Sequence, residues 1–357
     1  MANHSTIPVQ EITEPQEAEF IKMGISELLS GHDLNLETAK SIMQEIMNGS
    51  ATDAQIAAYL TALRMKGETV EEITASALVM RDHSQKVTSK IDAMDIVGTG
   101  GDKAFTFNIS TTAAFVIAAA GIPVAKHGNR SSSSKSGSAD VLEALGVKID
   151  LAAAQSEKML NEINMCFMFS QNYHPAMKYA APVRKQIAAR TIFNILGPLA
   201  NPANTTMQML GVYDTALVNP LAKVLQNLGI KKGMVFGGND GLDEITLTTT
   251  TEVAEIRNGV IKSFIFDPKD YGFDYCHKEA LMGDTPEVNA QITLAIFAGE
   301  KGPKRDTILC NAGLAIYLAK EDITISEAIQ LAGTLIDNGA ALDKLNEFIK
   351  QSHEVTA

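Results

Sequence analysis

Glycines, an aspartate and hydroxyl side chains are concentrated in residues 95–111, which read DIVGTGGDKAFTFNIST. Glycines let backbone N–H groups approach an anion closely, and a helix that begins near Ser110 adds oriented donors and a favourable dipole. Asn108 and Thr111 supply further side-chain donors. The stretch lacks the Gly-Lys pair of a Walker loop, and Lys103 stands where a dinucleotide fingerprint needs its third glycine. We therefore predict a phosphate-binding loop of another kind, with a tight capped turn as the structural alternative.

A second loop of the same character spans residues 126–140, KHGNRSSSSKSGSAD. It combines Lys126, His127, Arg130 and Lys135 with a row of hydroxyls, between a predicted strand and a predicted helix. Loops of this kind meet at the carboxyl edge of an α/β sheet, where ligands bind. Two donor-rich loops side by side suit an extended, multiply charged phosphate. A solvated basic loop or, for its serine-rich part, a flexible linker is the alternative.

Carboxylates follow a predicted buried strand in residues 233–244, GMVFGGNDGLDE. Asp240, Asp243 and Glu244 are suitable for Mg²⁺, which proteins usually hold by one or two carboxylates while substrate phosphates and waters complete the shell. A surface acidic turn would have the same composition. Residues 173–202 add Arg184, whose planar guanidinium suits a carboxylate, although a structural ion pair explains it equally well.

Charge and composition exclude several classes of protein. The formal net charge is −12, which argues against nonspecific nucleic-acid binding and requires any positive charge for an anionic substrate to be local. No apolar run reaches the 18 residues of a membrane span, so we expect no membrane partner. The N-terminus lacks the pattern of a signal peptide, and Cys166, Cys276 and Cys310 match no metal or redox spacing. We expect reduced thiols and a cytoplasmic protein.

The elements that must position these loops fall into two groups. Residues 17–85 predict four amphipathic helices with short connections. From residue 94, strands alternate with helices, which is typical of a parallel sheet, and residues 252–266 predict a hairpin around Arg-Asn-Gly. The predicted fold class is α/β, with a small N-terminal all-helical domain and a larger α/β domain whose mainly parallel central sheet is flanked by helices. The expected limits are an extension at 1–20, a helical domain at 21–93 joined by helices from about 176–200, and the α/β domain at 94–357.

Eight motifs in one order resemble the anthranilate phosphoribosyltransferase family over roughly residues 24–345. They are GTGGD, NIST, KHGNR, SGSADVLEALG, HPAMK, PVR, TIFNILGPLANP and GLDE. The resemblance implies a homodimer of the nucleoside-phosphorylase-like class. It also implies transfer of the 5-phosphoribosyl group of phosphoribosyl pyrophosphate (PRPP) to the amine of anthranilate, with release of pyrophosphate, in tryptophan biosynthesis. Mg²⁺ is the implied cofactor, and PRPP and anthranilate are the implied small-molecule partners.

The resemblance also assigns roles to residues that match the family motifs. The implied PRPP-binding residues are Gly98, Gly101, Asp102, Thr106, Asn108, Ile109, Ser110, Thr111, Lys126, His127, Gly128, Asn129, Arg130, Ser131, Ser132, Ser133, Ser134 and Ser138. The implied magnesium ligands are Ser110, Asp243 and Glu244, and the implied anthranilate-binding residues are Gly98, Asn129 and Arg184, with Arg184 facing the carboxylate. We expect Lys126, Asp243 and Glu244 to be catalytic because the departing pyrophosphate must be stabilised.

Two departures from the family pattern concern the entry of anthranilate. Ser132 replaces a small apolar residue that is commoner there, and Tyr173 replaces a histidine found in many members. No strong general base stands out, and His127 is a weak candidate. Two rival functions share the fold: a nucleoside-phosphorylase-like enzyme, whose loops differ from those quoted, and a non-catalytic nucleic-acid-binding relative, which would carry a basic face and broken motifs.

Overall fold

The structure, a computed structural model, describes residues 18–89, 91–131 and 134–355. Most of the predicted N-terminal extension lies outside these residues, and the first helix begins at Glu19, two residues before the expected limit. None of the described helices is both long and apolar enough to cross a membrane.

Four helices form the N-terminal module: α1 (Glu19–Leu29), α2 (Leu36–Asn48), α3 (Asp53–Lys66) and α4 (Val70–Asp82). Thr52 and Thr69 begin α3 and α4 with capping boxes, in which each threonine side chain accepts from a backbone N–H three residues later. Gly49 ends α2 in the left-handed conformation that glycine adopts without steric cost. The four predicted helices are therefore confirmed.

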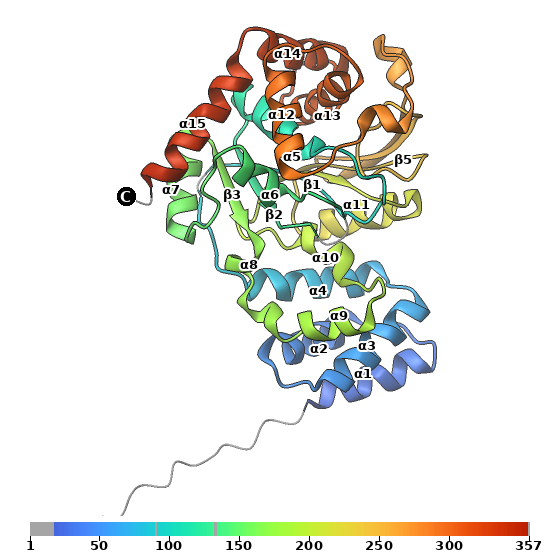
Figure 1. The fold of residues 1–357 in the computed structure, drawn as a ribbon. Coiled ribbons are helices and arrows are strands. Elements are labelled where there is room, and N and C mark those ends of the chain that lie inside the picture. Colours follow the sequence, from blue (N-terminus) through green and yellow to red (C-terminus); the bar gives the residue numbers. More distant parts are fainter. Residues whose placement is uncertain (1–17, 90, 132–133, 356–357) are drawn as a thin grey trace, which may run out of the picture.

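Later segments return to this module. The chain leaves the sheet through α8 (Ser170–Tyr173) and the turn Pro175–Lys178, forms α9 (Ala181–Ile187) and α10 (Phe193–Leu199), and then re-enters the sheet. Val183 of α9 and Leu196 of α10 belong to the same buried cluster as Ile42 of α2 and Tyr59 of α3. Figure 1 shows α9 beside α2 and α3, far from its sequence neighbours in the sheet. The core of the module thus needs chain from two distant parts of the sequence.

The larger part is built on one seven-stranded sheet in the order β3-β2-β1-β4-β5-β6-β7. The strands are β1 (Met94–Gly98), β2 (Val124–Gly128), β3 (Met165–Phe169), β4 (Met207–Gly211), β5 (Lys232–Gly238), β6 (Thr251–Arg257) and β7 (Val260–Phe266). The strands β1 to β5 are parallel to one another, and β6 is antiparallel to both β5 and β7 and forms a hairpin with β7. The predicted parallel sheet and hairpin are both confirmed.

Helices cover both faces of the sheet. The remaining ones are α5 (Ile109–Ala119), α6 (Ser138–Ala144), α7 (Ala153–Ile163), α11 (Val218–Asn227), α12 (Pro286–Phe297), α13 (Pro303–Ala319), α14 (Ile325–Asp337) and α15 (Ala340–Glu354). Alternate residues of β5 enter different cores: Met234 and Phe236 pack with α5 and α13, whereas Val235 packs with α11 and the helical module. This period of two is expected of a strand that is buried on both faces.

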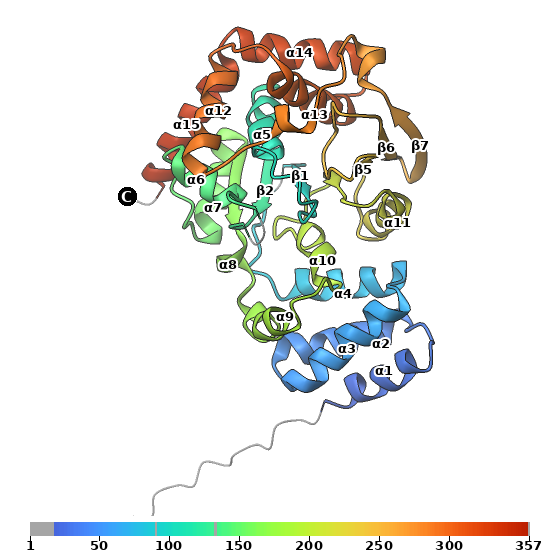
Figure 2. The ribbon, with the colours of Figure 1, turned by 45° about the vertical axis from the view of Figure 1, so that its right-hand side comes forward.

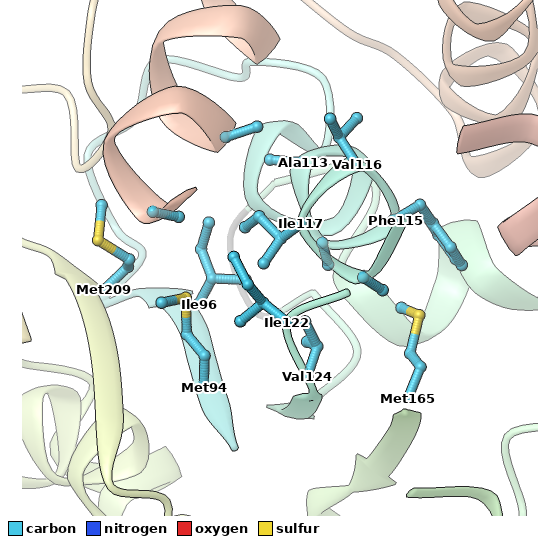
Figure 3. Close-up of a cluster of buried hydrophobic side chains, with 14 of the residues drawn as sticks. Met94, Ile96, Ala113, Phe115, Val116, Ile117, Ile122, Val124, Met165 and Met209 are labelled. Atoms are coloured by element: carbon cyan, nitrogen blue, oxygen red, sulfur yellow. The ribbon is translucent and has the colours of Figure 1, made fainter. Parts of the chain in front are cut away.

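The helix α5 lies at the centre of the buried core that it forms with β1, β2, β3 and α13. Ile117 points towards Ile96 of β1 and Ile122, and Val116 lies on the opposite side of α5, as Figure 3 shows. Phe115 makes edge-to-face contacts with Phe297 and Phe348, with ring centroids 6.3 and 5.7 Å apart. This packing on all sides fixes the N-terminal end of α5 at the carboxyl edge of β1 and β2, where the predicted loops lie.

Candidate active site

The glycine loop, residues 98–108, joins the end of β1 to the start of α5. A side chain at Gly98 would collide with the Asp243 carboxylate, and one at Gly211 of β4 would collide with the Asp243 backbone. Gly100 and Gly101 have φ angles of +70° and +77°, in the left-handed region that favours glycine. The glycines are therefore required partly because the acidic loop after β5 lies directly against them.

Asp243 and Glu244 hold the two ends of the glycine loop. The Gly100 N–H donates to Asp243 Oδ2 at 2.6 Å, and the Ser110 N–H donates to Glu244 Oε1 at 3.3 Å. The structure thus brings together Ser110, Asp243 and Glu244, which sequence reasoning assigned to magnesium. Asp240 does not join them. Its carboxylate accepts from the Leu242 N–H and from the Thr248 hydroxyl, which is a structural role in the turn.

Negative charge is crowded at this place. Asp243 and Glu244 are each only 8 % exposed. Burial, and after it the charge of Asp102, raises the pKa of Asp243 above the usual range; burial and the charge of Asp243 do the same for Glu244. A divalent cation would relieve this repulsion. Within the described residues, no three His, Cys, Asp or Glu side chains form a metal site of their own.

Lys126 and His127 lie in a buried strand and not on the exposed loop that was predicted for them. Both lie within β2, where Lys126 pairs with Phe167 and His127 with Met168 of β3, and they are only 3 % and 5 % exposed. The predicted exposed basic loop therefore begins two to three residues later than expected. The Lys126 ammonium donates to the Ile96 carbonyl and, at 3.3 Å, to the Ser110 hydroxyl. Burial lowers the pKa of Lys126, and the charges of Asp95 and Glu244 oppose that shift.

The second loop packs directly against the first. The Asn108 amide donates to the Ser136 carbonyl at 3.1 Å, and the Ser136 hydroxyl donates to the Asn108 side chain at 3.1 Å. Ser138 donates to the Asn129 carbonyl at 3.2 Å, and a side chain at Gly128 would collide with Ser138. The two predicted phosphate loops are thus neighbours with direct hydrogen bonds between them.

Not every residue assigned to this loop presents its side chain there. Arg130 is held by Asp140 at 2.8 Å and Glu143 at 2.5 Å, and its guanidinium lies 5.4 Å from the Phe169 ring centroid. The Ser131 hydroxyl contacts Ser134. Ser132 and Ser133 lie outside the described residues.

Three further residues assigned to phosphate binding, Thr106, Ile109 and Thr111, differ in the burial of their side chains. The side chains of Ile109 and Thr111 are buried in the core around α5, and Thr106 forms a backbone bridge with Met282. The buried side chains of Ile109 and Thr111 therefore cannot reach a phosphate, and these two residues could serve an anion only through their backbone. Thr106 lies three residues before α5, and its side chain is half-buried.

Two histidines lie beneath the second loop. The rings of His127 and His174 have centroids 5.0 Å apart, and the Nε2 atom of each is buried without a hydrogen-bond partner among the described residues. Burial lowers the pKa of His127 to about 3 and that of His174 to about 4. Both rings are neutral near pH 7 and bind protons poorly, which argues against His127 as a general base. Tyr173, at the predicted departure from the family, is buried and donates to Ser156 Oγ at 2.7 Å.

Two arginines lie in or after α9 without a carboxylate partner in the described part of the chain. Arg184 is half-buried, its guanidinium lies 5.1 Å from the Phe193 ring centroid, and burial lowers its pKa. The structural ion pair that the sequence allowed for Arg184 is not formed with any described residue. Arg190, which carried no predicted role, donates from Nη2 to the Gly101 carbonyl and stacks on Tyr213 at 3.6 Å from the ring centroid.

A cavity of about 550 Å³ lies elsewhere, between α12 and the start of α13, and its lining contains none of the predicted site residues. Its walls include Val288, Ile292 and Arg305. The chemistry predicted from the sequence therefore lies in the loops at the sheet edge rather than in this cavity.

Comparison with known proteins gives a consistent assignment. Residues 24–84 match the helical bundle domain and residues 90–342 the a/b domain of a glycosyl transferase family. The chain is 54 % identical over 334 residues to an anthranilate phosphoribosyltransferase of Ruminiclostridium cellulolyticum, covering 94 % of this chain and 98 % of that one. It is 53 % identical to the one from Methanobrevibacter smithii, covering 94 % and 100 %.

Solved structures of anthranilate phosphoribosyltransferases have a fold similar to that of this chain. The Thermus thermophilus anthranilate phosphoribosyltransferase has a TM-score of 0.88 and 36 % identity, with 92 % of this chain and 99 % of that chain covered. The Saccharomyces cerevisiae enzyme, in complex with PRPP and Mg, has a TM-score of 0.86 and 27 % identity, with 94 % and 98 % covered. The predicted resemblance and fold class are confirmed, and the chain belongs to the anthranilate phosphoribosyltransferase family of glycosyl transferases.

Proposed function

We propose that this protein transfers the 5-phosphoribosyl group of PRPP to the amine of anthranilate, giving N-(5-phosphoribosyl)anthranilate and pyrophosphate in tryptophan biosynthesis. The observation that carries the proposal is the meeting of the glycine loop, the start of α5 and the Asp243–Glu244 pair at one sheet edge. Relatives at more than 50 % identity carry the name of this activity.

The two loops are the proposed PRPP site. The phosphates of PRPP would lie against the glycine loop and the start of α5, since a helix N-terminus is a usual site for an anion. The N–H groups of Gly100 and Ser110 already donate to Asp243 and Glu244, so other groups of the loop must serve the phosphates. Asp102, Asn108, the Ser110 hydroxyl and the second loop from Gly128 to Ser138 complete the site. Arg130 must exchange its contacts with Asp140 and Glu143 if its guanidinium is to reach a phosphate.

Mg²⁺ is the proposed cofactor, held by Asp243 and Glu244 with the Ser110 hydroxyl. When bound, it neutralises negative charge on the pyrophosphate. The structure of the yeast relative is described as a complex with PRPP and Mg. In this chain the supporting observation is the crowding of buried carboxylates, whose raised pKa values mark unfavourable negative charge.

Lys126 is the proposed protein cation for the leaving group. Its ammonium contacts Ser110 at the start of α5 and lies between the charges of Asp95 and Glu244. This fixed charge raises the local potential where the pyrophosphate departs, at little reorganisation cost. We expect Lys126 to act through electrostatics rather than through proton transfer.

Arg184, with Gly98 and Asn129, is the proposed anthranilate site. The half-buried guanidinium of Arg184 lacks an ion-pair partner among the described residues and is suited to the planar carboxylate of anthranilate. The C1–O bond to pyrophosphate breaks, the bond from the amine nitrogen to C1 forms, and the amine proton leaves after attack. The aryl amine is neutral near pH 7, so the step needs no strong base, in agreement with the neutral His127.

The remaining expectations concern organisation. We propose a helical domain at residues 21–93 completed by helices from about 176–200, an α/β domain at 94–357, a homodimer, and a cytoplasmic location without nucleic-acid or membrane partners. The shared core of α2, α3, α9 and α10 supports the composition of the helical domain. Light scattering on the purified protein would test the dimer.

The first experiment follows anthranilate fluorescence after mixing protein, anthranilate, PRPP and Mg²⁺. A fall in fluorescence that needs PRPP and is stopped by EDTA is expected. Absence of a fall with folded protein would refute the proposed activity. Release of free base from a nucleoside with inorganic phosphate would instead support the rival phosphorylase.

A further inference from the structure

The glycine loop adopts a conformation that needs support from outside. Besides Gly100 and Gly101, Lys103 and Phe105 have positive φ angles, of 60° and 53°. Non-glycine residues in this region are disfavoured by contacts of their Cβ atoms. The loop therefore keeps this shape only while surrounding groups hold it.

Contacts from the α/β part hold the two ends of the loop. The Thr99 N–H donates to the Gly211 carbonyl at 2.9 Å, beside the Asp243 contact with Gly100. Further on, the Phe105 carbonyl accepts from the Gly283 N–H at 2.9 Å, and the Phe107 N–H donates to the Leu281 carbonyl at 3.1 Å. Between these two groups of contacts, the carbonyl of Gly101 accepts from Arg190.

Arg190 comes from a different part of the molecule. It lies between α9 and α10, whose buried residues pack with the helical module, and Figure 2 shows α10 between the sheet and α4. Its guanidinium is stacked on Tyr213, in the segment after β4, and forms no ion pair with any described residue. A planar guanidinium can stack on a ring and donate to a carbonyl at once, which a lysine ammonium cannot do equally well.

We propose that Arg190 is a positioning residue that holds the PRPP loop through the Gly101 carbonyl and links it to the Arg184 segment. The inference rests on the proposed function for the identity of the two ligands. Arg184 lies in α9, six residues before Arg190, and the connection from α9 to α10 carries Arg190. Movement of this connection when anthranilate binds is transmitted to the loop that binds PRPP, and by linkage PRPP acts back on anthranilate.

Kinetics with matched variants test the role of the residue. Arg190→Ala is expected to raise the KM for PRPP about tenfold, the effect of losing one charge-assisted hydrogen bond, with a smaller change in kcat. Arg190→Lys should also raise the KM for PRPP, but by less than Arg190→Ala does. Lys185→Ala, which removes an exposed cation from α9, should stay within about twofold of wild type. An unchanged KM for PRPP in Arg190→Ala overturns the proposal.

The stacking partner provides an independent variant if Arg190→Ala is poorly folded. Tyr213→Leu removes the ring that orients the guanidinium and should raise the KM for PRPP, whereas Tyr213→Phe keeps the ring and should behave as wild type. Equal effects of Leu and Phe overturn the stacking role. Thermal unfolding of each variant separates a local effect from a general loss of structure.

The link between the sites is measured at equilibrium. The Kd of anthranilate is determined with and without Mg²⁺ and pyrophosphate, which serve as an unreactive probe of the PRPP site. Wild type should show a change in Kd that disappears in Arg190→Ala. A Kd that does not respond in wild type, or that responds equally in the variant, overturns the link.

Hydrogen exchange separates this proposal from the proposed function. Amides of residues 99–107 should exchange faster in Arg190→Ala than in wild type, while those of 138–144 remain unchanged. This readout needs no substrate. If wild type fails to consume anthranilate but the exchange result is obtained, the proposed function is wrong and the positioning role stands. Unchanged exchange at 99–107 refutes the positioning role even in an active enzyme.

Discussion

Asp243→Asn should inactivate the protein while making its metal-free form more stable. The carboxylate is buried, and both burial and the charge of Asp102 raise its pKa. Such a group favours the folded state at low pH, and its contribution is lost as the pH rises from the unfolded pKa through the folded one. At pH 8 the native protein therefore bears an unfavourable charge that asparagine removes. The amide oxygen of asparagine can still accept from the Gly100 N–H, now 2.6 Å from the carboxylate.

The magnitude follows from linkage. Each unit by which the pKa is raised destabilises the ionised protein by about 1.4 kcal/mol. The rise of the pKa from 3.8 to about 7 sets an upper limit of about 4 kcal/mol, and we expect a gain of about 1–3 kcal/mol on substitution. For a chain of this size that corresponds to a rise of about 1–2 °C in Tm per kcal/mol. In wild type, Mg²⁺ should raise the Tm in the same way because it compensates the charge. In Asp243→Asn that response should be weak.

Thermal unfolding at pH 8 in EDTA and in Mg²⁺, together with anthranilate fluorescence, checks the prediction. We expect turnover to fall at least about 100-fold, since the leaving charge loses its metal. Asp240→Asn in the same loop is the control: its carboxylate holds Leu242 and Thr248, so the variant should lose stability but keep turnover. A metal-free Asp243→Asn that is less stable than wild type, or one with wild-type turnover, would refute the reasoning.

Three further predictions concern the other parts of the site. Arg184→Ala should raise the KM for anthranilate about 10- to 100-fold and that for PRPP much less, and steady-state kinetics with equal effects on both would contradict a carboxylate role. Gly98→Ala should lower stability by about 1–3 kcal/mol and reduce turnover, because its methyl group collides with Asp243; urea unfolding as stable as wild type would show that the loop can move aside. Burial lowers the pKa of His127 to about 3. Below about pH 6.5 the imidazole is therefore protonated in the unfolded chain but not in the folded protein, so the folded protein becomes less stable as the pH falls. Between pH 7 and 5.5, wild type should lose about 1 kcal/mol more than His127→Gln in urea unfolding, and equal losses would count against a neutral buried ring.

Sequence patterns predicted the layers of this fold well because each depended on a local rule. The period of the apolar residues distinguished the four N-terminal helices from the strands that follow. The hairpin was predictable from Arg-Asn-Gly, and Asn258 and Gly259 do have the positive φ angles, 52° and 75°, of such a turn. The order of the strands in the sheet follows from no local rule, because β1 pairs with β4 across more than a hundred residues.

The site was predictable in its composition but not in its contacts. Lys126 and His127 have polar side chains and were therefore expected on an exposed loop, yet hydrogen bonding to β3 continues the strand through both. Arg130 was expected to bind PRPP from the second loop, and no local pattern predicted its ion pairs with Asp140 and Glu143 on the next helix. The contact from Arg190 to Gly101 joins residues 89 positions apart, and it forms only because the chain returns to the helical module through α9 and α10 before it re-enters the sheet.

The return of the chain to the helical module through α9 and α10 has a consequence for synthesis on the ribosome. The core of the helical module includes Val183 and Leu196, so the four N-terminal helices emerge long before the residues that complete their packing. By then β1, β2 and β3 have also been made, but β1 still lacks β4, its neighbour on the other side. Both parts of the nascent chain therefore expose apolar surface until residues near 210 have emerged. A pause in translation before that point would lengthen the time in which a chaperone is needed.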